Sequence, residues 1–154
     1  MAKVTALLHT NNDALRLGRC LETLYACDDV VIVDHNSQDR TVRVAHEYGA
    51  RIVTDREPGS VLSRLATEWI FCLDPRESMT EALAATLYEW KAQTHREGCF
   101  SICLREETAD GWISHKSPLP RLVSKNWGHW QGNFPAEAPS GVVLEGDLLR
   151  FAFP

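Results

Sequence analysis

Short apolar runs that end in an aspartate alternate with amphipathic segments along the first two-thirds of the chain. Residues 30–33 read VVIV and are followed by Asp34, and residues 69–73 read WIFCL and are followed by Asp74. A continuous, β-branched run is typical of a parallel strand that is covered on both faces. The alternation therefore predicts an α/β domain with a central, mostly parallel sheet and helices on both of its faces.

The segments between the expected strands carry helix signals. Between residues 14 and 24, Leu17, Leu21 and Leu24 recur at i, i+4 and i+7, which is the stripe of an amphipathic helix. Ser37 is expected to cap the next helix, with Gly49 at its end. Ser78 and Glu81 match a capping box, S-x-x-E, and are expected to open a longer helix.

After about residue 97 the chain changes to short strand-like runs joined by Gly, Pro and Asn turns. These runs are residues 99–104, 111–117, 120–125 and 141–153. They predict mixed or antiparallel strands at one side of the sheet. A length of 154 residues favours a single domain, residues 1–154, with an α/β half (1–97) and a strand-rich half (98–154).

Composition and charge argue against several classes of function. The net charge is −5, which disfavours nucleic acid as a partner, because phosphate-backbone binding needs a basic face. Five cysteines without a CxxC pair argue against a disulfide framework or a structural zinc site, so we expect reduced thiols and a cytoplasmic location. The sequence predicts neither a signal peptide nor a membrane-spanning helix. Peripheral association with a membrane or with a partner protein stays an alternative.

Aspartates stand at the ends of three expected strands, as Asp34, Asp55 and Asp74. In an open parallel sheet, ligands bind beyond the carboxyl ends of the strands, near the point at which the strand order reverses. Three carboxylates at that edge can accept hydrogen bonds from a base or a ribose, or hold a metal ion. The alternative is a structural role, since aspartate also caps turns at strand ends.

Three motifs carry a family resemblance. The chain reads HTNND at residues 9–13, VDHNSQDRT at residues 33–41 and WIFCLDPRE at residues 69–77. It resembles the family 2 glycosyltransferases, which typically read T-x-N-E, VD-x-x-S-x-D-x-T and W-I-L-x-L-D-A-D-E, and within them the small bacterial branch similar to lipopolysaccharide core glycosyltransferases. The resemblance implies a GT-A fold, a nucleoside diphosphate sugar as donor, and inverting transfer of the sugar to an acceptor hydroxyl of bacterial cell-envelope polysaccharide. The halves 1–97 and 98–154 would then bind nucleotide and acceptor.

The resemblance also implies roles for individual residues. Thr10, Asn12 and Asp13 match the first motif and are expected to bind the nucleotide sugar. Asp34 matches the carboxylate that typically receives the nucleotide base, and Asp74 matches the first acid of the D-x-D motif. Asp55 and Arg76 are further candidates for this site. The loop and helix start behind Asp34 are expected to be structural: Ser37, Asp39 and Thr41.

The chain departs from the family pattern at three places. Arg76 stands where the family places the second, metal-binding aspartate. The segment before WIFCLD is short, and Arg64 is its one candidate to replace the basic residues usually found there. The acceptor-side His-Glu pair is reduced to Glu137 beside Ala136. Glu137 is the candidate catalytic base, and a solvated surface glutamate is the alternative.

The LDPRE segment admits three interpretations. In the first, Arg76 replaces the metal and binds the diphosphate in bidentate fashion, so that no cofactor is needed. Asp74 alone is a poor ligand set for Mg²⁺ or Mn²⁺, and the guanidinium would repel the ion. In the second, Arg76 forms a surface ion pair with Glu77 in an inactive site. In the third, Glu77 replaces the missing metal ligand.

The leading hypothesis is therefore a glycosyltransferase that works without a tightly bound metal. The alternative is a catalytically degenerate module that binds nucleotide sugars in a regulatory or scaffold role, and a weaker one is an unrelated α/β nucleotide-binding protein. Three tryptophans either stack on a sugar or pack the C-terminal strands: Trp112, Trp127 and Trp130. Four histidines match no metal-ligand spacing and are expected at strand ends or on the surface: His9, His35, His115 and His129.

Overall fold

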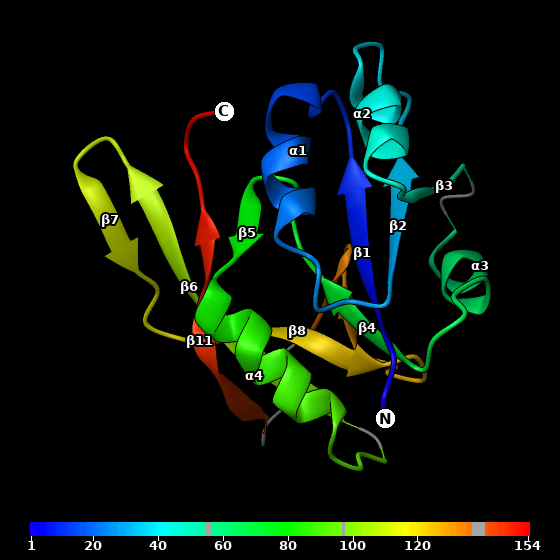
Figure 1. Cartoon of the computed structure of the whole chain (residues 1–154), viewed down its shortest axis with the longest axis vertical. Helices are drawn as coiled ribbons and strands as arrows, with labels where there is room; N and C mark the ends of the chain where they lie inside the picture. Colours follow the sequence, from blue (N-terminus) through cyan, green and yellow to red (C-terminus); the bar gives the residue numbers. More distant parts are fainter. Residues whose placement is uncertain (55–56, 97, 137–140) are drawn as a thin grey trace.

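A computed structural model describes residues 1–54, 57–96, 98–136 and 141–154 of the chain (Figure 1). Strands and helices alternate in the first half: β1 (Val4–Thr10), α1 (Ala14–Glu22), β2 (Asp29–Asp34), α2 (Thr41–Glu47), β3 (Arg51–Val53), α3 (Pro58–Ser63), β4 (Trp69–Cys72), β5 (Glu77–Met79) and α4 (Glu81–Lys91). The second half consists of strands: β6 (Cys99–Thr108), β7 (Gly111–Ser114), β8 (Leu119–Ser124), β9 (Trp130–Gln131), β10 (Phe134–Pro135) and β11 (Val142–Arg150).

Within the described residues, one sheet of nine strands has the order β3-β2-β1-β4-β8-β6-β11-β5, and β7 pairs with β6 beside this path. The strands β1, β2, β3 and β4 are parallel to one another, which confirms the predicted parallel half. The strand β8 is antiparallel to both β4 and β6, so the C-terminal half is mixed, as predicted. The strand order reverses between β1 and β4, because the chain adds β2 and β3 on one side of β1 and then returns to add β4 on the other.

Alternating side chains of the central strands build two apolar cores on opposite faces of the sheet. On one face, Leu8 of β1 and Phe71 of β4 belong to a core that includes side chains of α1, α2 and α4. On the other face, Leu7 and Ile70 pack with Val61 of α3, and residues of the β9–β10 hairpin cover the same core. Helices therefore lie on both faces, and Figure 1 shows α4 in front of β8 and β11. None of the helices in the described part of the chain is long and apolar enough to span a bilayer.

Helix α4 begins two residues later than the sequence predicted. Its N-cap is Thr80, whose Oγ1 accepts a hydrogen bond from the backbone N–H of Leu83 at 3.2 Å. Ser78 lies in β5, where it pairs with Leu149 of β11. The predicted capping box of Ser78 and Glu81 is therefore wrong. The backbone of β5 is used for antiparallel pairing, and the helix can start only after that pairing ends.

A buried carboxylate joins three strands next to the end of β4. Glu77 in β5 is 0% exposed, and its Oε1 and Oε2 accept hydrogen bonds from the two Nη groups of Arg121 in β8, at 2.7 and 3.0 Å. Oε2 also accepts from Nη2 of Arg150 in β11 at 2.8 Å. Oε1 accepts in addition from the backbone N–H of Asp74 at 2.8 Å. The same carboxylate thus connects β5, β8 and β11 with the turn that follows β4.

Both interpretations that the sequence allowed for Glu77 are wrong. The carboxylate neither pairs with Arg76 on the surface nor faces a ligand, because it points into the molecule. Its two guanidinium partners lie 44 and 73 residues away in the sequence, where local spacing gives no sign of them. Burial of a charge is tolerated only when it is paired and hydrogen-bonded, and these arginines supply that pairing.

We predict that Glu77→Gln lowers the free energy of unfolding by about 3 kcal/mol, because it leaves two guanidiniums without their charged partner. Urea unfolding of wild type and variant measures the loss. Glu47→Gln is the matched control, since Glu47 forms an exposed ion pair with Arg43 in which the side chains are 60% and 70% exposed. That variant is expected to lose less than about 1 kcal/mol. Similar losses in the two variants would contradict the assigned role of Glu77.

Candidate functional site

A cavity of about 470 Å³ lies at the carboxyl ends of β1, β2 and β4, beside the point at which the strand order reverses. Its lining consists of His9, Thr10, Asn11, Asp13, Arg16, His35, Asp74, Pro75, Arg76 and Asn133. Two smaller cavities, of about 20 and 60 Å³, share His9 and Asn133 with it and reach Trp130 and Phe134. The structure thus brings four predicted site residues together in one cavity: Thr10, Asp13, Asp74 and Arg76.

Asp34 ties the end of β1 to the loop after β2. Its Oδ1 accepts hydrogen bonds from Thr10 Oγ1 at 2.7 Å and from Ser37 Oγ at 2.6 Å, and its Oδ2 accepts from the Ser37 backbone N–H at 3.0 Å. Burial disfavours the charge, but these bonds outweigh it and hold the pKa of Asp34 below its usual value. A carboxylate has about four acceptor positions, so Asp34 retains room for one bond from a ligand.

Ser37 does not cap α2, and that prediction was wrong. The hydroxyl of Ser37 donates to Asp34, while α2 begins at Thr41 and has Arg40 at its N-cap without a side-chain capping bond. The Ser37 oxygen accepts a hydrogen bond from the Asn12 backbone N–H at 2.8 Å, while its O–H donates to Asp34, so both functions of the hydroxyl are used in joining the loops.

The loop after β1 is fastened to the loop after β2 by Asn12. This residue has a positive φ of 54°, and its Oδ1 accepts a hydrogen bond from the Gln38 backbone N–H at 2.8 Å. Its own backbone N–H donates to Ser37 Oγ at 2.8 Å. The neighbouring Asn11, rather than Asn12, lines the cavity, and its Nδ2 donates to the His35 carbonyl at 2.6 Å. The amide that lines the cavity is therefore that of Asn11, one position before the residue that matches the motif.

Asp13 stands at the start of α1 and faces the cavity. Its backbone N–H donates to Thr41 Oγ1, and its Oδ2 accepts from the Asn11 backbone N–H, each at 2.8 Å. Burial raises the pKa of the Asp13 carboxyl. Asp39 accepts hydrogen bonds from Thr41 and from the backbone N–H of Ala14, the latter at 3.2 Å, so it caps α1 from across the loop. These contacts agree with the structural role expected for Ser37, Asp39 and Thr41.

Arg76 folds back onto Asp74, the residue that matches the first acid of the D-x-D motif. Its Nε donates to Asp74 Oδ1 at 2.9 Å and its Nη2 to Oδ2 at 3.2 Å, and its backbone N–H also reaches Oδ1 at 2.9 Å. Burial opposes ionisation of Asp74, but the bonds from Arg76 outweigh it and hold the carboxyl pKa below its usual value. The Arg76 side chain is 43% exposed. A guanidinium has five N–H donors, of which this carboxylate takes two.

The residues at Asp74 do not fit a divalent cation. Both carboxylate oxygens accept bonds from Arg76, and Glu77 points into the core. A cation 4 Å from the guanidinium would be repelled by about 4 kcal/mol per unit charge at an effective dielectric constant near 20. Among the residues that the structure describes, no group of three or more His, Cys, Asp or Glu side chains is placed to hold a metal ion.

Other predicted site residues lie elsewhere or outside the described residues. Asp55 and Glu137 fall in the gaps of the described ranges, so their roles stay predictions. Arg64 is at the C-cap of α3. Trp127 and Trp130 pack against the core under α3, which supports packing over sugar stacking for these two side chains. Trp112 lies on β7 and meets the ring of Phe151 edge-on.

Two histidines to which the family pattern assigns no role, although they stand within the first two motif segments, meet at the edge of the cavity. His9 Nδ1 lies 2.9 Å from His35 Nε2, a hydrogen bond between the ends of β1 and β2. Burial, with repulsion from a proton on His35, lowers the pKa of His9 to about 4. His9 is therefore neutral at pH 7. Their position in the sequence could have indicated this place at the cavity, since each histidine directly adjoins a residue of the family pattern, Thr10 or Asp34, at a strand end.

We predict that acid destabilises the protein through His9. Between pH 6.5 and 4 the unfolded chain binds a proton at this ring and the folded chain does not, so the free energy of unfolding falls as the pH falls through that range. The contribution is about 2 kcal/mol at pH 5 and nearly absent at pH 7. Urea unfolding at both pH values should show a smaller loss in His9→Gln than in wild type. An equal loss in the two proteins would refute the prediction.

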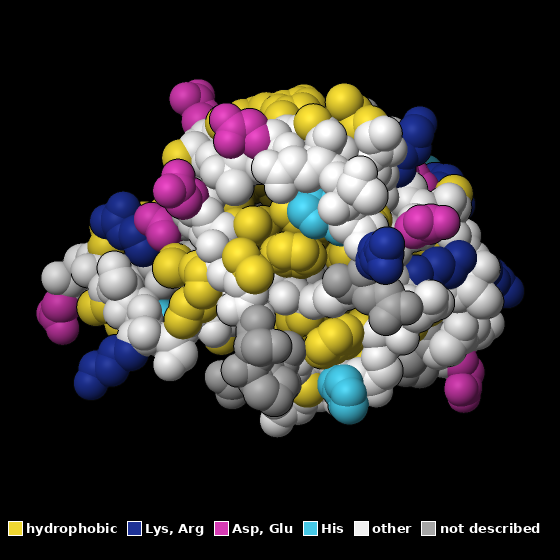
Figure 2. Space-filling view, turned by 90° about the horizontal axis from the view of Figure 1, so that it is seen from below, with side chains coloured by type: hydrophobic (Ala, Val, Ile, Leu, Met, Phe, Trp, Pro, Cys, Tyr) yellow, Lys and Arg dark blue, Asp and Glu magenta, His cyan; other side chains and the backbone are white. Residues whose placement is uncertain are grey.

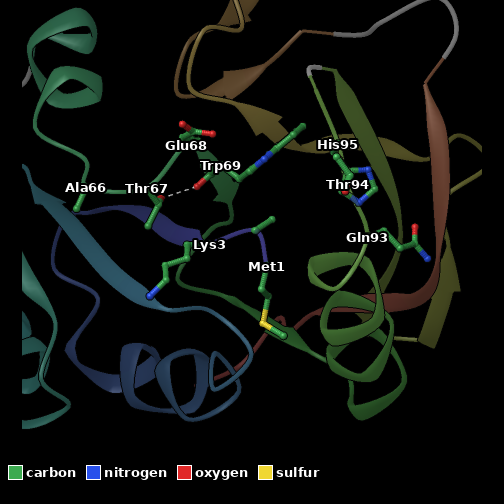
Figure 3. Close-up of a pocket in the computed structure, with 10 residues that line it drawn as sticks. Met1, Lys3, Ala66, Thr67, Glu68, Trp69, Gln93, Thr94 and His95 are labelled. Carbon is green, nitrogen blue, oxygen red and sulfur yellow. Dashed lines mark hydrogen bonds between the residues drawn. The ribbon is translucent and has the colours of Figure 1, made fainter.

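A second cavity, of about 450 Å³, lies at the opposite, amino ends of β1 and β4 (Figure 3). Lys3, Glu68 and His95 are among its lining residues, and Figure 2 views this end of the molecule, where apolar side chains lie between charged ones. Of the residues in the three motifs, only Trp69, the first residue of the third motif, is in this lining, and none of the predicted site residues lies there. Because ligands of open parallel sheets bind at the carboxyl ends of the strands, the cavity beside Asp74 is the candidate site.

Comparison with known proteins supports the resemblance that the motifs indicated. No model of a known protein family matches the chain. The chain is 31% identical over 159 residues to an uncharacterized glycosyltransferase of Rickettsia bellii. This match covers 95% of this chain and 54% of the relative. An uncharacterized glycosyltransferase of Rickettsia felis is 30% identical over 162 residues, covering 96% of this chain and 57% of the relative. The chain thus spans about half the length of the curated relatives it matches.

Solved structures share the fold. Residues 1–349 of TarS from S. aureus match with a TM-score of 0.57 and 16% identity, over 80% of this chain and 47% of that one. The same protein in complex with UDP matches with a TM-score of 0.54 and 18% identity, over 71% and 37% of the two chains. Mannosyl-3-phosphoglycerate synthase from Rubrobacter xylanophilus matches with a TM-score of 0.55 and 20% identity, over 71% of this chain and 42% of that one. The predicted GT-A-like fold is confirmed, and the names of the relatives bear out the resemblance to glycosyltransferases.

Proposed function

We propose that this chain contains the donor site of a glycosyltransferase, which binds a nucleoside diphosphate sugar in the cavity beside Asp74 and transfers the sugar to an acceptor hydroxyl. The observation that carries the proposal is the convergence of three separate motifs on one cavity at the reversal of strand order. The names of the curated relatives support sugar transfer. The UDP complex of a protein with the same fold supports a nucleotide donor.

The nucleoside half of the donor is assigned to the ends of β1 and β2. Asp34 stays ionised at neutral pH and keeps an acceptor position for an N–H of the base or an O–H of the ribose. Thr10 and His35 line the cavity, and Asp34, which is not itself among the lining residues, lies directly behind Thr10 and accepts its hydrogen bond. Because Thr10 and Ser37 already hold Asp34 in place, its carboxylate is oriented before a ligand arrives.

The diphosphate is assigned to Arg76, without a tightly bound divalent metal. In sugar transfer, the anomeric carbon forms a bond to the acceptor oxygen and loses its bond to the diphosphate oxygen. Negative charge then grows on the departing diphosphate, which many enzymes stabilise with a metal ion. The N–H donors of Arg76 that Asp74 leaves unused can bind two phosphate oxygens at once and stabilise the same charge. The acceptor proton passes to a base, for which Glu137 is the candidate, and a single displacement inverts the anomeric configuration.

The acceptor is proposed to be a hydroxyl of bacterial cell-envelope polysaccharide, and the location of the reaction to be the cytoplasm. The first proposal rests on the likeness to the lipopolysaccharide core branch, and the second on the five cysteines without a CxxC pair. The β9–β10 hairpin of the C-terminal half lies next to the cavity. Asn133, in its turn, is in the lining, and Phe134 of β10 lines the adjoining small cavity. Contact with a membrane or a partner protein would bring such an acceptor to the site.

One observation favours a second candidate function. Asp74 accepts three hydrogen bonds from Arg76, so the acid that matches the D-x-D motif is paired with a positive charge, which opposes a cation at this carboxylate. A module with this arrangement can bind a nucleotide sugar without turnover, in a regulatory or scaffold role. Release of UDP from a UDP-sugar in the presence of acceptor polysaccharide distinguishes the enzyme from the module.

We predict that UDP binding, measured by calorimetry, is insensitive to EDTA in wild type and weaker in Arg76→Ala by about 1.5–3 kcal/mol, the range for hydrogen bonds to a charged group. Arg43→Ala, which removes an exposed arginine on α2, is the matched control and should bind like wild type. Strong dependence of wild-type binding on Mn²⁺ would overturn the metal-free site. If no nucleotide diphosphate raises the melting temperature of the wild type, both the enzyme and the binding module are refuted.

A further inference from the structure

Arg16 is a basic residue of the cavity that belongs to none of the three motifs. It lies in the first turn of α1, next to the apolar stripe of Leu17, Cys20 and Leu21 that packs under the helix. Its side chain is 30% exposed, far less than the 70% of Arg43 on α2, and it lines the same cavity as Asp74 and Arg76. The fold thus directs a second guanidinium to the site at which the diphosphate is proposed to bind.

The guanidinium of Arg16 is held less firmly than the other arginines at this end of the sheet. Its contact with Asp13 is a 3.8 Å approach of Nε to Oδ1, longer than a hydrogen bond. By contrast, Arg121 and Arg150 are hydrogen-bonded to a buried carboxylate. Arg19 donates from Nη1 to a backbone carbonyl and stacks on an aromatic ring at 3.9 Å. In the part of the chain that the structure describes, the N–H donors of Arg16 therefore remain available for a ligand.

A single guanidinium is a weak substitute for a divalent metal. The charge of Arg76 is already shared with Asp74, while a departing nucleoside diphosphate carries more than one negative charge. A second arginine restores a double positive charge, and each guanidinium can bind two phosphate oxygens. We infer that Arg16 binds the diphosphate of the donor together with Arg76, one guanidinium coming from α1 and the other from the turn after β4. This inference rests on the proposed function and names the group that Arg16 recognises.

The test compares wild type with Arg16→Gln and Arg16→Lys, using three probes: UDP, inorganic pyrophosphate and uridine. Calorimetry measures the dissociation constants of the two phosphate compounds, and NMR titration measures that of uridine. We expect Arg16→Gln to weaken UDP and pyrophosphate by about 10- to 100-fold and to leave uridine unchanged, because only the phosphates meet the guanidinium. Arg16→Lys should lose less, since it keeps the charge but not the bidentate geometry. Arg43→Gln removes the same charge at an exposed position outside the cavity lining, and its dissociation constants should equal those of wild type.

The outcomes separate this inference from the proposed function. Wild-type affinity for UDP in Arg16→Gln would overturn the role of Arg16 and leave the nucleotide site standing. Equal weakening of uridine and UDP would assign Arg16 to the structure of the loop and also overturn its phosphate role. Binding of pyrophosphate that depends on Arg16, without any binding of UDP, would uphold the phosphate site and refute the nucleotide donor. Absence of binding for all three probes would refute both.

Discussion

The buried carboxylate of Glu77 is the interaction on which the site and the C-terminal half both depend. A carboxylate removed from water costs several kcal/mol unless charged partners surround it, and here Arg121 and Arg150 supply them. Their hydrogen bonds connect β8 and β11 to β5, although only β11 is its neighbour in the sheet. The same carboxylate accepts the backbone N–H of Asp74, so the turn that carries Asp74 and Arg76 is attached to the core. The position of this edge of the cavity therefore depends on an ion network whose members are not in the lining.

The residues of the motifs spend much of their hydrogen-bonding capacity on one another. Asp34 holds Thr10 and Ser37, and Asn12 and Asp39 fasten the loops after β1 and β2 together. Such mutual bonding orients the carboxylate of Asp34 in advance, which lowers the entropic cost of binding a ligand. Arg16, which lies outside the motifs, and Arg76, within the third, by contrast reach the cavity with N–H donors to spare. The two arginines that we propose to bind phosphate are thus distinct from the residues that hold the loops together.

Elements with a strong local or periodic signal were predicted from the sequence. The runs at residues 30–33 and 69–73 became β2 and β4, and their expected parallel arrangement is confirmed. The leucine stripe of α1 faces the core as its spacing indicated. The two helix caps at Ser37 and Ser78 were wrong. Each serine had a competing partner, which was the Asn12 backbone N–H for Ser37 and the neighbouring strand β11 for Ser78, and those partners outweighed the local capping signal.

By itself, the sequence determined which strands would be buried and where acidic residues would stand at their carboxyl ends. Those properties follow from residue type and from spacing along the chain. Only the tertiary structure decided the partners of the charged groups. Arg76 pairs with Asp74, whereas Glu77 pairs with arginines 44 and 73 residues away. The physical reason is that the energy of a charge depends on its burial and on the groups within a few ångströms, and folding alone sets both.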